Sequence, residues 1–381
     1  MAVYLDNNAT TALDEAVLQA MLPYMGKVAG NPSSVHRFGR LQKDAIEQAR
    51  ESVAQLVGAR AEQVIFTSGG TESNNLLLNG FNRANKSARI VISQIEHMSL
   101  LEPSQHLAEV VDLVAVNEAG CVELSALMPL ITDKSSLVSV MTANNETGVI
   151  QSLAPLIAFA RQQGCYFHTD ATQAAGKIPL NFIESGVHAM TVSAHKLYGP
   201  VGAGALVIDK QLPIAKLQFG GTQEKNMRAG TENVPAIVGF GKAAELALAN
   251  LEDAYIHLRA LRDALEQKLK TLPSVKIFAE QSERLPNTVQ FGVEGFDGET
   301  LLMQLDRKAI AVSSGSACTS GKTEPSHVLK AMNIKQPLAS SAIRVSFGKY
   351  NTMSDVDALF TALADIIDIN QHSSVMLAAN V

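Results

Sequence analysis

The chain has 381 residues, a formal net charge of −6 and an apolar fraction of 46%. This apolar content is enough to form a packed core, which excludes extended disorder, and the mild acidity offers no basic surface for direct binding of nucleic acid. No run of about 18 apolar residues could cross a membrane, and the first residues carry no charged-then-apolar signal region.

Short apolar runs alternate with helical patterns over the first two thirds of the chain. The runs that predict strands are 64–66, 89–92, 137–141, 165–168, 189–193 and 205–208. Because continuous apolar strands separated by helices are typical of a parallel sheet covered on both faces, we expect an α/β architecture.

The pattern changes after about Val234. A long helical region is predicted to reach Leu272, and its second part carries leucines at spacings of three, four and seven, which form one apolar stripe. The remaining chain predicts strands near 274–278, 288–291 and 342–347 and helices near 299–306 and 355–368. We therefore expect a smaller α+β domain, with its boundary inside the long helical region.

The segment Thr67–Asn74 places glycines between a predicted strand and the start of a helix. Backbone N–H groups, the helix dipole and hydroxyl groups converge at such a point, which suits a phosphate. The segment has neither the lysine of a Walker loop nor the spacing of a dinucleotide site. An ordinary strand-to-helix turn with a Thr or Ser cap is the alternative.

Two further strands end in polar residues. Asp170 could hold a cationic group of a cofactor at the edge of the sheet, or it could only cap the next helix. Lys196 lies in small, glycine-rich surroundings that favour the neutral amine of a Schiff-base lysine, although most lysines are surface charges. A phosphate cradle, a downstream aspartate and a lysine form the ordered set that pyridoxal 5'-phosphate (PLP) needs for its phosphate, its pyridine nitrogen and its aldehyde.

The three cysteines are too few for a disulfide framework or a zinc cluster, so we expect reduced thiols, a cytoplasmic protein and no metal site. Cys121 and Cys165 are typical of small buried side chains. Cys318 lies in the small, polar segment 313–321, where nothing apolar would bury it. We interpret it as a nucleophile or sulfur carrier on a loop that we expect to be mobile.

With these residues together, the sequence resembles the NifS/IscS-type cysteine desulfurases of the class V aminotransferase superfamily, which are fold type I PLP enzymes. The resemblance covers nearly the whole chain. Its motifs are Tyr4–Thr11, Gly30–His36, Thr67–Glu72, Glu96–His97, Asn144–Gly148, His168–Gln173, Ala194–Pro200, Arg228–Asn233, Ser313–Ser320, Glu324–His327 and Ile343–Ser346.

The resemblance implies how the cofactor is held. Lys196 would bind PLP covalently, Asp170 would pair with the pyridine nitrogen, and Gln173 would hydrogen-bond the phenolic oxygen. His97 would stack on the ring and transfer protons. The residues implied for the phosphate are Gly70, Thr71, Ser193, His195 and, from the other subunit of a homodimer, Thr231.

The resemblance also implies the reaction. Asn145 and Arg344 would bind the carboxylate of L-cysteine, and Cys318 would take its sulfur as a persulfide while L-alanine leaves. The sulfur would then pass to an acceptor protein for iron–sulfur cluster assembly or thiolation. Two positions depart from the family pattern, because Thr222 and Lys225 stand where relatives usually carry His and Arg.

The implied fold has a large PLP-binding domain over 14–258, with a mostly parallel seven-stranded sheet flanked by helices. A small α+β domain over 1–13 and 259–381 would carry the catalytic cysteine loop. The same site residues would also serve a selenocysteine lyase or a desulfurase dedicated to tRNA or DNA thiolation. An aminotransferase or a kynureninase-like enzyme needs no cysteine at 318, and a non-catalytic PLP-fold scaffold or sulfur carrier would not need the intact set of site residues.

Overall fold

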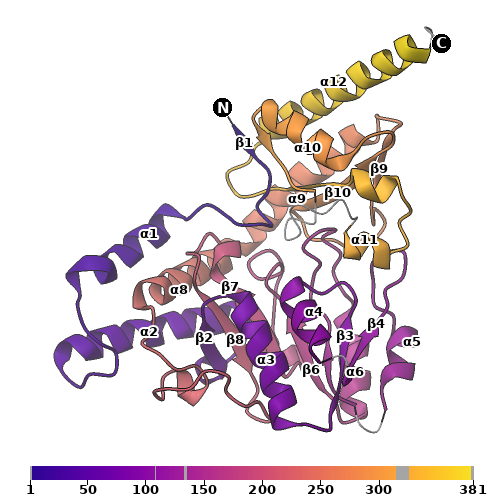
Figure 1. The fold of residues 1–381 in the computed structure, drawn as a ribbon. Coiled ribbons are helices and arrows are strands. Elements are labelled where there is room, and N and C mark those ends of the chain that lie inside the picture. Colours follow the sequence, from indigo (N-terminus) through magenta and orange to yellow (C-terminus); the bar gives the residue numbers. More distant parts are fainter. Residues whose placement is uncertain (1, 108, 133–134, 315–325, 379–381) are drawn as a thin grey trace.

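A seven-stranded sheet forms the centre of the computed structural model, which describes residues 2–107, 109–132, 135–314 and 326–378 (Figure 1). The strands lie in the order β2, β8, β7, β6, β5, β3, β4, and only β8 runs antiparallel to its neighbours. Their bounds are Val64–Thr67 (β2), Arg89–Ser93 (β3), Val111–Val114 (β4), Ser135–Ser139 (β5), Tyr166–Asp170 (β6), Ala189–Ser193 (β7) and Gly204–Ile208 (β8). The expected α/β fold with a mostly parallel seven-stranded sheet is confirmed.

The apolar runs predict six of these strands and miss β4. This strand has the sequence Val-Asp-Leu-Val and lies at the edge of the sheet, where Leu113 is exposed and only Val114 is buried. An edge strand that is covered on one side alone does not need the continuous apolar run by which buried parallel strands are recognised.

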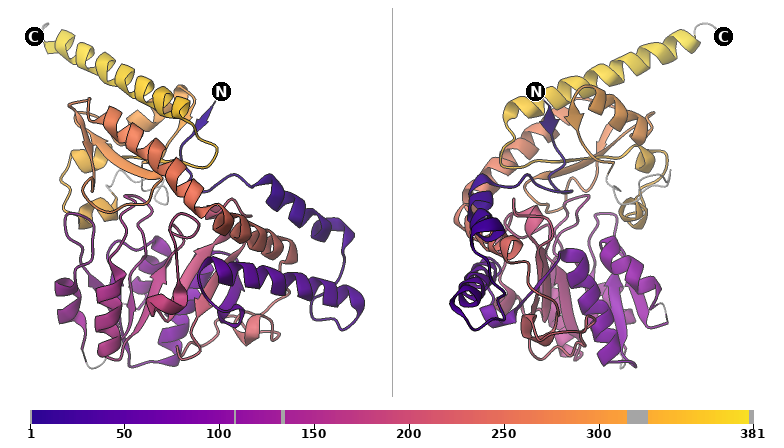
Figure 2. Two further views of the ribbon diagram at one scale, coloured as in Figure 1. Left: turned by 180° about the vertical axis from the view of Figure 1, so that it is seen from behind. Right: turned by 60° about the vertical axis from the view of Figure 1, so that its left-hand side comes forward.

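Helices pack on both faces of the large sheet (Figure 2). Ile90 and Ile92 of β3 join one hydrophobic cluster with α3 and α4, whereas Val91 between them joins the cluster on the opposite face with α2, α6 and α8. Side chains alternate in this way because successive residues of a strand point to opposite faces. The helix bounds are Arg37–Leu56 (α2), Gly70–Ala84 (α3), Met98–Gln105 (α4), Leu153–Gln162 (α6) and Val234–Ala249 (α8), with shorter helices at Glu15–Leu22 (α1), Leu124–Leu127 (α5) and Phe182–Ser185 (α7).

A second, antiparallel sheet lies above the first in Figure 1, in a part of the molecule where the N-terminal and C-terminal segments of the chain meet. It has the order β12, β10, β9, and a short parallel pair, β1 with β11, lies beside it. Leu5 packs into one hydrophobic cluster with leucines of α9 and with residues of β10, β12 and α12. The bounds are Val3–Tyr4 (β1), Leu251–Leu269 (α9), Val275–Ile277 (β9), Thr288–Val293 (β10), Gly298–Arg307 (α10), Ile310–Ala311 (β11), His327–Ala331 (α11), Ile343–Ser346 (β12) and Met353–Ala378 (α12).

The long helical region predicted from Val234 is two helices, α8 and α9, that meet at 75°. Asn250 between them leaves the helical conformation, and its side-chain amide donates to the carbonyl oxygen of Leu246 (2.7 Å). The amide ends α8 by satisfying one of its last carbonyl groups. As a bent pair these two helices have the length and apolar character of a membrane span, whereas no single helix among the described residues has both.

Candidate active site

The carboxyl ends of β2, β3, β5, β6 and β7 lie at one edge of the large sheet, since β8 is antiparallel to both β2 and β7. A cavity of about 330 Å³ lies at this edge. Ten of the predicted site residues line it: Gly70, Thr71, His97, Asn145, Asp170, Gln173, Ser193, His195, Lys196 and Arg344. The fold therefore brings together residues that are far apart in the sequence.

The start of α3 forms one wall of this cavity. A Cβ atom added to Gly70, its first residue, would lie 3.3 Å from Thr172 Oγ1, closer than an ordinary contact. Thr172 Oγ1 and Ser193 Oγ are both buried and have no hydrogen-bond partner in the structure. Since buried hydroxyl groups are nearly always paired, two unpaired ones beside a helix N-terminus indicate a site for an anionic group.

Asp170 is the last residue of β6, and its side chain is 7% exposed. Its Oδ2 atom accepts a hydrogen bond from Asn74 Nδ2 (2.8 Å), and its Oδ1 atom accepts one from the backbone N–H of Thr172 (2.9 Å). Burial and the charge of Asp170 raise the pKa of the neighbouring Glu96 carboxyl well above its usual range. This shift favours the neutral form of Glu96 and disfavours a second negative charge beside Asp170.

Lys196 ends the short 3-10 turn Ala194–Lys196 that follows β7. Its Nζ atom donates hydrogen bonds to the carbonyl oxygens of Asn8 and Ala9, the latter at 2.7 Å. Gln173 Nε2 also donates to the carbonyl oxygen of Asn8 (2.9 Å). The N-terminal segment thus holds the lysine and the glutamine side by side at the wall of the cavity.

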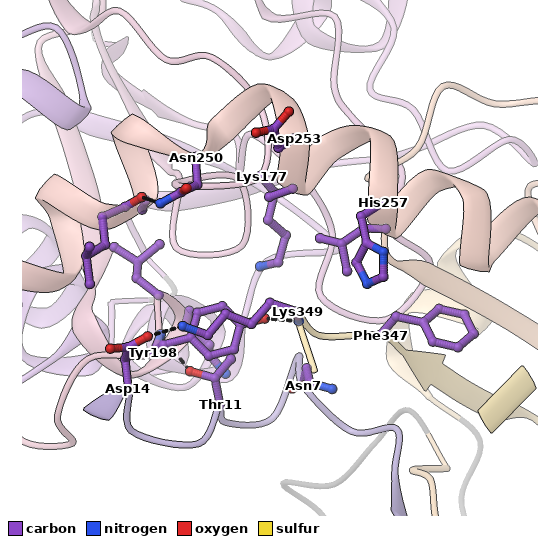
Figure 3. A pocket seen from close by; sticks show the side chains of 17 residues that line it. Asn7, Thr11, Asp14, Lys177, Tyr198, Asn250, Asp253, His257, Phe347 and Lys349 are labelled. Atoms are coloured by element: carbon purple, nitrogen blue, oxygen red, sulfur yellow. Dashed lines mark hydrogen bonds and ion pairs between the residues drawn. The ribbon is translucent and has the colours of Figure 1, made fainter. Parts of the chain in front are cut away.

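A second cavity, of about 410 Å³, also borders Lys196, and several of the polar groups that line it are already paired (Figure 3). Lys349 forms an ion pair with Asp14. The buried Lys177 donates from Nζ to the carbonyl oxygen of Gln173 (2.9 Å).

Arg344 reaches the first cavity from β12, so the small sheet supplies one of its walls. The side chain is buried, with Nη2 bound to Asp6 Oδ1 (2.6 Å) and Nη1 to the carbonyl oxygen of Asn145 (3.1 Å). Its Nε atom is buried and has no hydrogen-bond partner. A guanidinium group that is fixed in position and has an N–H without a partner is suited to bind a carboxylate.

Cys318 lies outside the described residues. The described residues that flank this gap contact the walls of the cavity. Ser313 pairs through its backbone with Arg344, and Ser326 Oγ lies 2.5 Å from the carboxyl of Glu146, which follows Asn145.

Cys121 is half-buried and Cys165 is buried. Burial raises the pKa of both thiols, so neither forms the reactive thiolate readily.

Thr231 is exposed and does not line the cavity within one chain. The turn before it is anchored to the large sheet: Glu224 binds Arg50 through two contacts of 2.8 Å, and Lys225 Nζ binds three backbone carbonyl oxygens, among them that of Val64 (2.8 Å). Lys225 therefore has a structural role in this turn, since its amine binds backbone carbonyl groups. Thr222 is exposed.

The sequence motifs assign no role to Thr172, Asn74 or Ser99. Thr172 could have been found as the first polar residue after β6, between Asp170 and Gln173. No local signal marks Asn74, because its partners Asp170 and Ser99 belong to other elements. Ser99 lies two residues after His97, at the start of the helix that His97 caps, and this position is its only local signal.

Comparison with known proteins agrees with this site. Residues 3–359 match the family described as Aminotransferase class-V. The chain is 43% identical over 372 residues to "Cysteine desulfurase IscS" of Dictyoglomus turgidum, covering 96% of this chain and 94% of the relative. It is 43% identical to "Cysteine desulfurase" of Sinorhizobium fredii over 99% of both chains.

A solved structure of a NifS-like protein from Rickettsia africae matches the fold with a TM-score of 0.88 and 37% identity, over 97% of this chain and all of that one. The family match and the two relatives each extend over most of the chain, including both sheets and the cavity between them. The chain therefore belongs to the class-V aminotransferase family and, within it, to the cysteine desulfurases.

Proposed function

We propose that the cavity between the two sheets binds PLP and L-cysteine, and that the sulfur of cysteine passes to Cys318 while L-alanine leaves. The observation that carries this proposal is the set of unpaired buried groups on one lining: Thr172 Oγ1, Ser193 Oγ and Arg344 Nε. Two hydroxyl groups suit a phosphate and the guanidinium suits a carboxylate, which are the anionic groups of the cofactor and of the amino acid.

The chain's class-V family is PLP-dependent, and the residues of this cavity fit the group. Gly70, Thr71, Ser193 and His195 would hold the phosphate with Thr172, a residue of the motif His168–Gln173 to which the resemblance assigned no role. Asp170 would keep the pyridine nitrogen protonated, Gln173 would bind the phenolic oxygen, His97 would cover the ring, and Lys196 would bind the aldehyde. The bound cofactor supplies an electron sink for the carbanion at the substrate α-carbon.

The chain's own residues then carry the reaction. Arg344 and Asn145 orient the substrate carboxylate, and Lys196 removes the α-proton. The Cys318 thiolate attacks the substrate sulfur, and the Cβ–S bond breaks with its electron pair going to Cβ. Cβ takes up a proton, so the products are alanine and a persulfide on Cys318.

We propose a homodimer in which Thr231 completes the partner's phosphate site. The N-terminal segment has exposed apolar side chains, including Met25, Phe38 of α2 and Val35, which precedes α2 and is 88% exposed. Val35 lines the same surface hollow as Thr222 and Glu232, so the loop that carries Thr231 borders this apolar surface. A second copy of the chain would cover the apolar side chains and receive Thr231.

The remaining parts of the proposal concern domains and sulfur delivery. We assign the large domain to 14–258 and the small domain to 1–13 with 259–381, supported by the shared cluster of Leu5 and Leu265. The persulfide sulfur would go to an acceptor protein for iron–sulfur cluster assembly or thiolation, in the cytoplasm, where Cys318 stays reduced.

Two variants test the proposal. Lys196→Ala should lose the absorbance of bound PLP and alanine formation together, whereas Lys210→Ala, at an exposed lysine, should keep both. Cys318→Ala should keep the PLP absorbance and bind cysteine but release little alanine, and mass spectrometry of the wild type should find the persulfide on Cys318. Alanine formation at the wild-type rate in either variant would overturn the assigned role.

A further inference from the structure

A chain of hydrogen bonds connects Asp170 to His97 through the side chains of Asn74 and Ser99, neither of which has been assigned a role so far. Asn74, on α3, is fully buried, and its Nδ2 atom lies 2.8 Å from Asp170 Oδ2 and 2.8 Å from Ser99 Oγ. Ser99 Oγ, on α4, lies 2.9 Å from His97 Nδ1. Both ends of this chain of hydrogen bonds therefore reach the cavity, at Asp170 and at His97.

The direction of each hydrogen bond follows from the number of hydrogens available. The amide nitrogen of Asn74 can only donate, and the two short contacts use both of its hydrogens. The opposite orientation of this amide would set its oxygen against the Asp170 carboxylate. Ser99 Oγ is therefore an acceptor toward Asn74, and its single hydrogen is left for His97 Nδ1.

His97 Nδ1 receives a second donor as well. The backbone N–H of Ser99 points at it from 3.1 Å, because His97 is the N-cap residue of α4. A ring nitrogen that accepts from an O–H and an N–H has no room for a proton of its own. The proton of neutral His97 must then be on Nε2.

Burial favours the neutral ring. It lowers the pKa of His97 against the raising effect of Asp170, and the proximity of Lys196 lowers the pKa further. Burial also raises the pKa of Glu96, which disfavours a further negative charge next to the ring.

We propose that Ser99 and Asn74 are positioning residues that hold His97 in its Nε2–H tautomer, tied to Asp170 through the buried amide. His97 then meets the substrate as a proton donor at Nε2, not as a base. This role rests on the proposed function, but the tautomer itself is a property of the folded chain that can be measured without turnover.

The experiment is nitrogen NMR of the full-length protein with isotope-labelled histidine, with the His97 signals assigned from their loss in His97→Gln. The wild type should show Nε2–H and an accepting Nδ1. Ser99→Ala removes one of the two donors that stabilise unprotonated Nδ1, so His97 should titrate about one pH unit higher, the shift expected for one hydrogen bond.

Two further variants act as controls. Ser104→Ala, at a buried serine of the same helix whose hydroxyl donates to the carbonyl oxygen of Leu101 (2.7 Å), should leave the His97 titration unchanged. Ser99→Thr keeps the hydroxyl and should restore the wild-type titration. The pH profile of alanine formation should shift with the NMR titration.

A wild-type signal with the proton on Nδ1, or equal titration of His97 in wild type, Ser99→Ala and Ser104→Ala, would overturn the inference. An inactive protein with the expected tautomer would instead contradict the proposed function and leave the inference standing.

Discussion

Two cavities border Lys196, and they differ in what their polar groups lack. The larger, of about 410 Å³, contains ion pairs and hydrogen bonds that are already complete, such as Lys349 with Asp14 and His257 Nε2 with the carbonyl oxygen of Asn351 (3.0 Å). No buried polar side-chain atom of its described lining lacks a partner. The smaller, of about 330 Å³, has three such atoms, on Thr172, Ser193 and Arg344.

The ligand site is therefore identified by its buried polar atoms without a hydrogen-bond partner, and not by the volume of the cavity. An unpaired buried polar group destabilises the folded chain by about 1–3 kcal/mol. Several such groups in one cavity indicate that a bound ligand supplies their missing hydrogen bonds.

The largest effect is expected at the carboxylate end of the smaller cavity. Arg344→Gln should lower kcat/KM for cysteine about 100-fold, mainly through KM, because the substrate carboxylate loses charge-assisted hydrogen bonds. Steady-state kinetics measure this. The matched control is Arg284→Gln, at a buried arginine paired with Glu266 (2.7 Å) outside both cavities, which should reduce stability but leave KM unchanged. An unchanged KM in Arg344→Gln would remove the substrate role of this residue.

The second-largest effect is expected at the phosphate end of the same cavity. The double variant Thr172→Val with Ser193→Ala should bind PLP about 30-fold more weakly, while the melting temperature of the cofactor-free protein should not fall, because neither hydroxyl has a partner to lose. Absorbance titration with PLP and thermal unfolding measure the two quantities.

A paired hydroxyl should behave in the opposite way. Thr142 Oγ1 lies 2.8 Å from Thr169 Oγ1 in the core. Thr142→Val should therefore cost about 1 kcal/mol of stability without weakening PLP binding. Equal PLP affinity in the double variant and the wild type would contradict the claim that the unpaired hydroxyl groups of the smaller cavity bind the ligand.

In the larger cavity the expected effect is on stability and its pH dependence. Burial, helped by the charge of Lys196, lowers the pKa of Lys177 to about 7. In the unfolded chain Lys177 keeps its proton up to its ordinary pKa, so between pH 7 and that value the unfolded state binds more protons and stability rises with pH.

Lys177→Met removes this titration, so the variant should lose the rise in stability, by about 2 kcal/mol between pH 7 and pH 9, relative to the wild type. Denaturant unfolding at several pH values measures it. Lys210→Met, at an exposed lysine, is the control and should keep the wild-type slope. A Lys177→Met protein with the wild-type slope would show that Lys177 is charged in the fold.

The smallest effect is expected at the two cysteines outside both cavities. Cys121→Ala and Cys165→Ala should keep alanine formation within about 2-fold of the wild type, because burial raises the pKa of both thiols and disfavours the thiolate. A persulfide found on either residue by mass spectrometry, with none on Cys318, would contradict the assignment of the working thiol.

Much of this site was predictable from residue types at the ends of apolar strands. Asp170 and Lys196 could be recognised because a carboxylate and a lysine after buried strands of a parallel sheet face one edge. The leucine stripe that includes Leu258 and Leu265 was predictable for the same kind of reason, since a helical period needs only local sequence. Strand β4 and the bend at Asn250 were not, because a half-exposed edge strand and a single helix-ending amide leave little pattern.

The α/β class, the order of the motifs and the identity of the chemical groups follow from the residues alone, because these depend on local period and residue type. The packed chain was needed to show which of two cavities beside Lys196 has unmet polar groups, and that Asn74 and Ser99 connect Asp170 with His97. Hydrogen-bond pairing is a property of atoms brought together from distant parts of the chain. The sequence names donors and acceptors, but only the packed structure shows which of them remain without a partner.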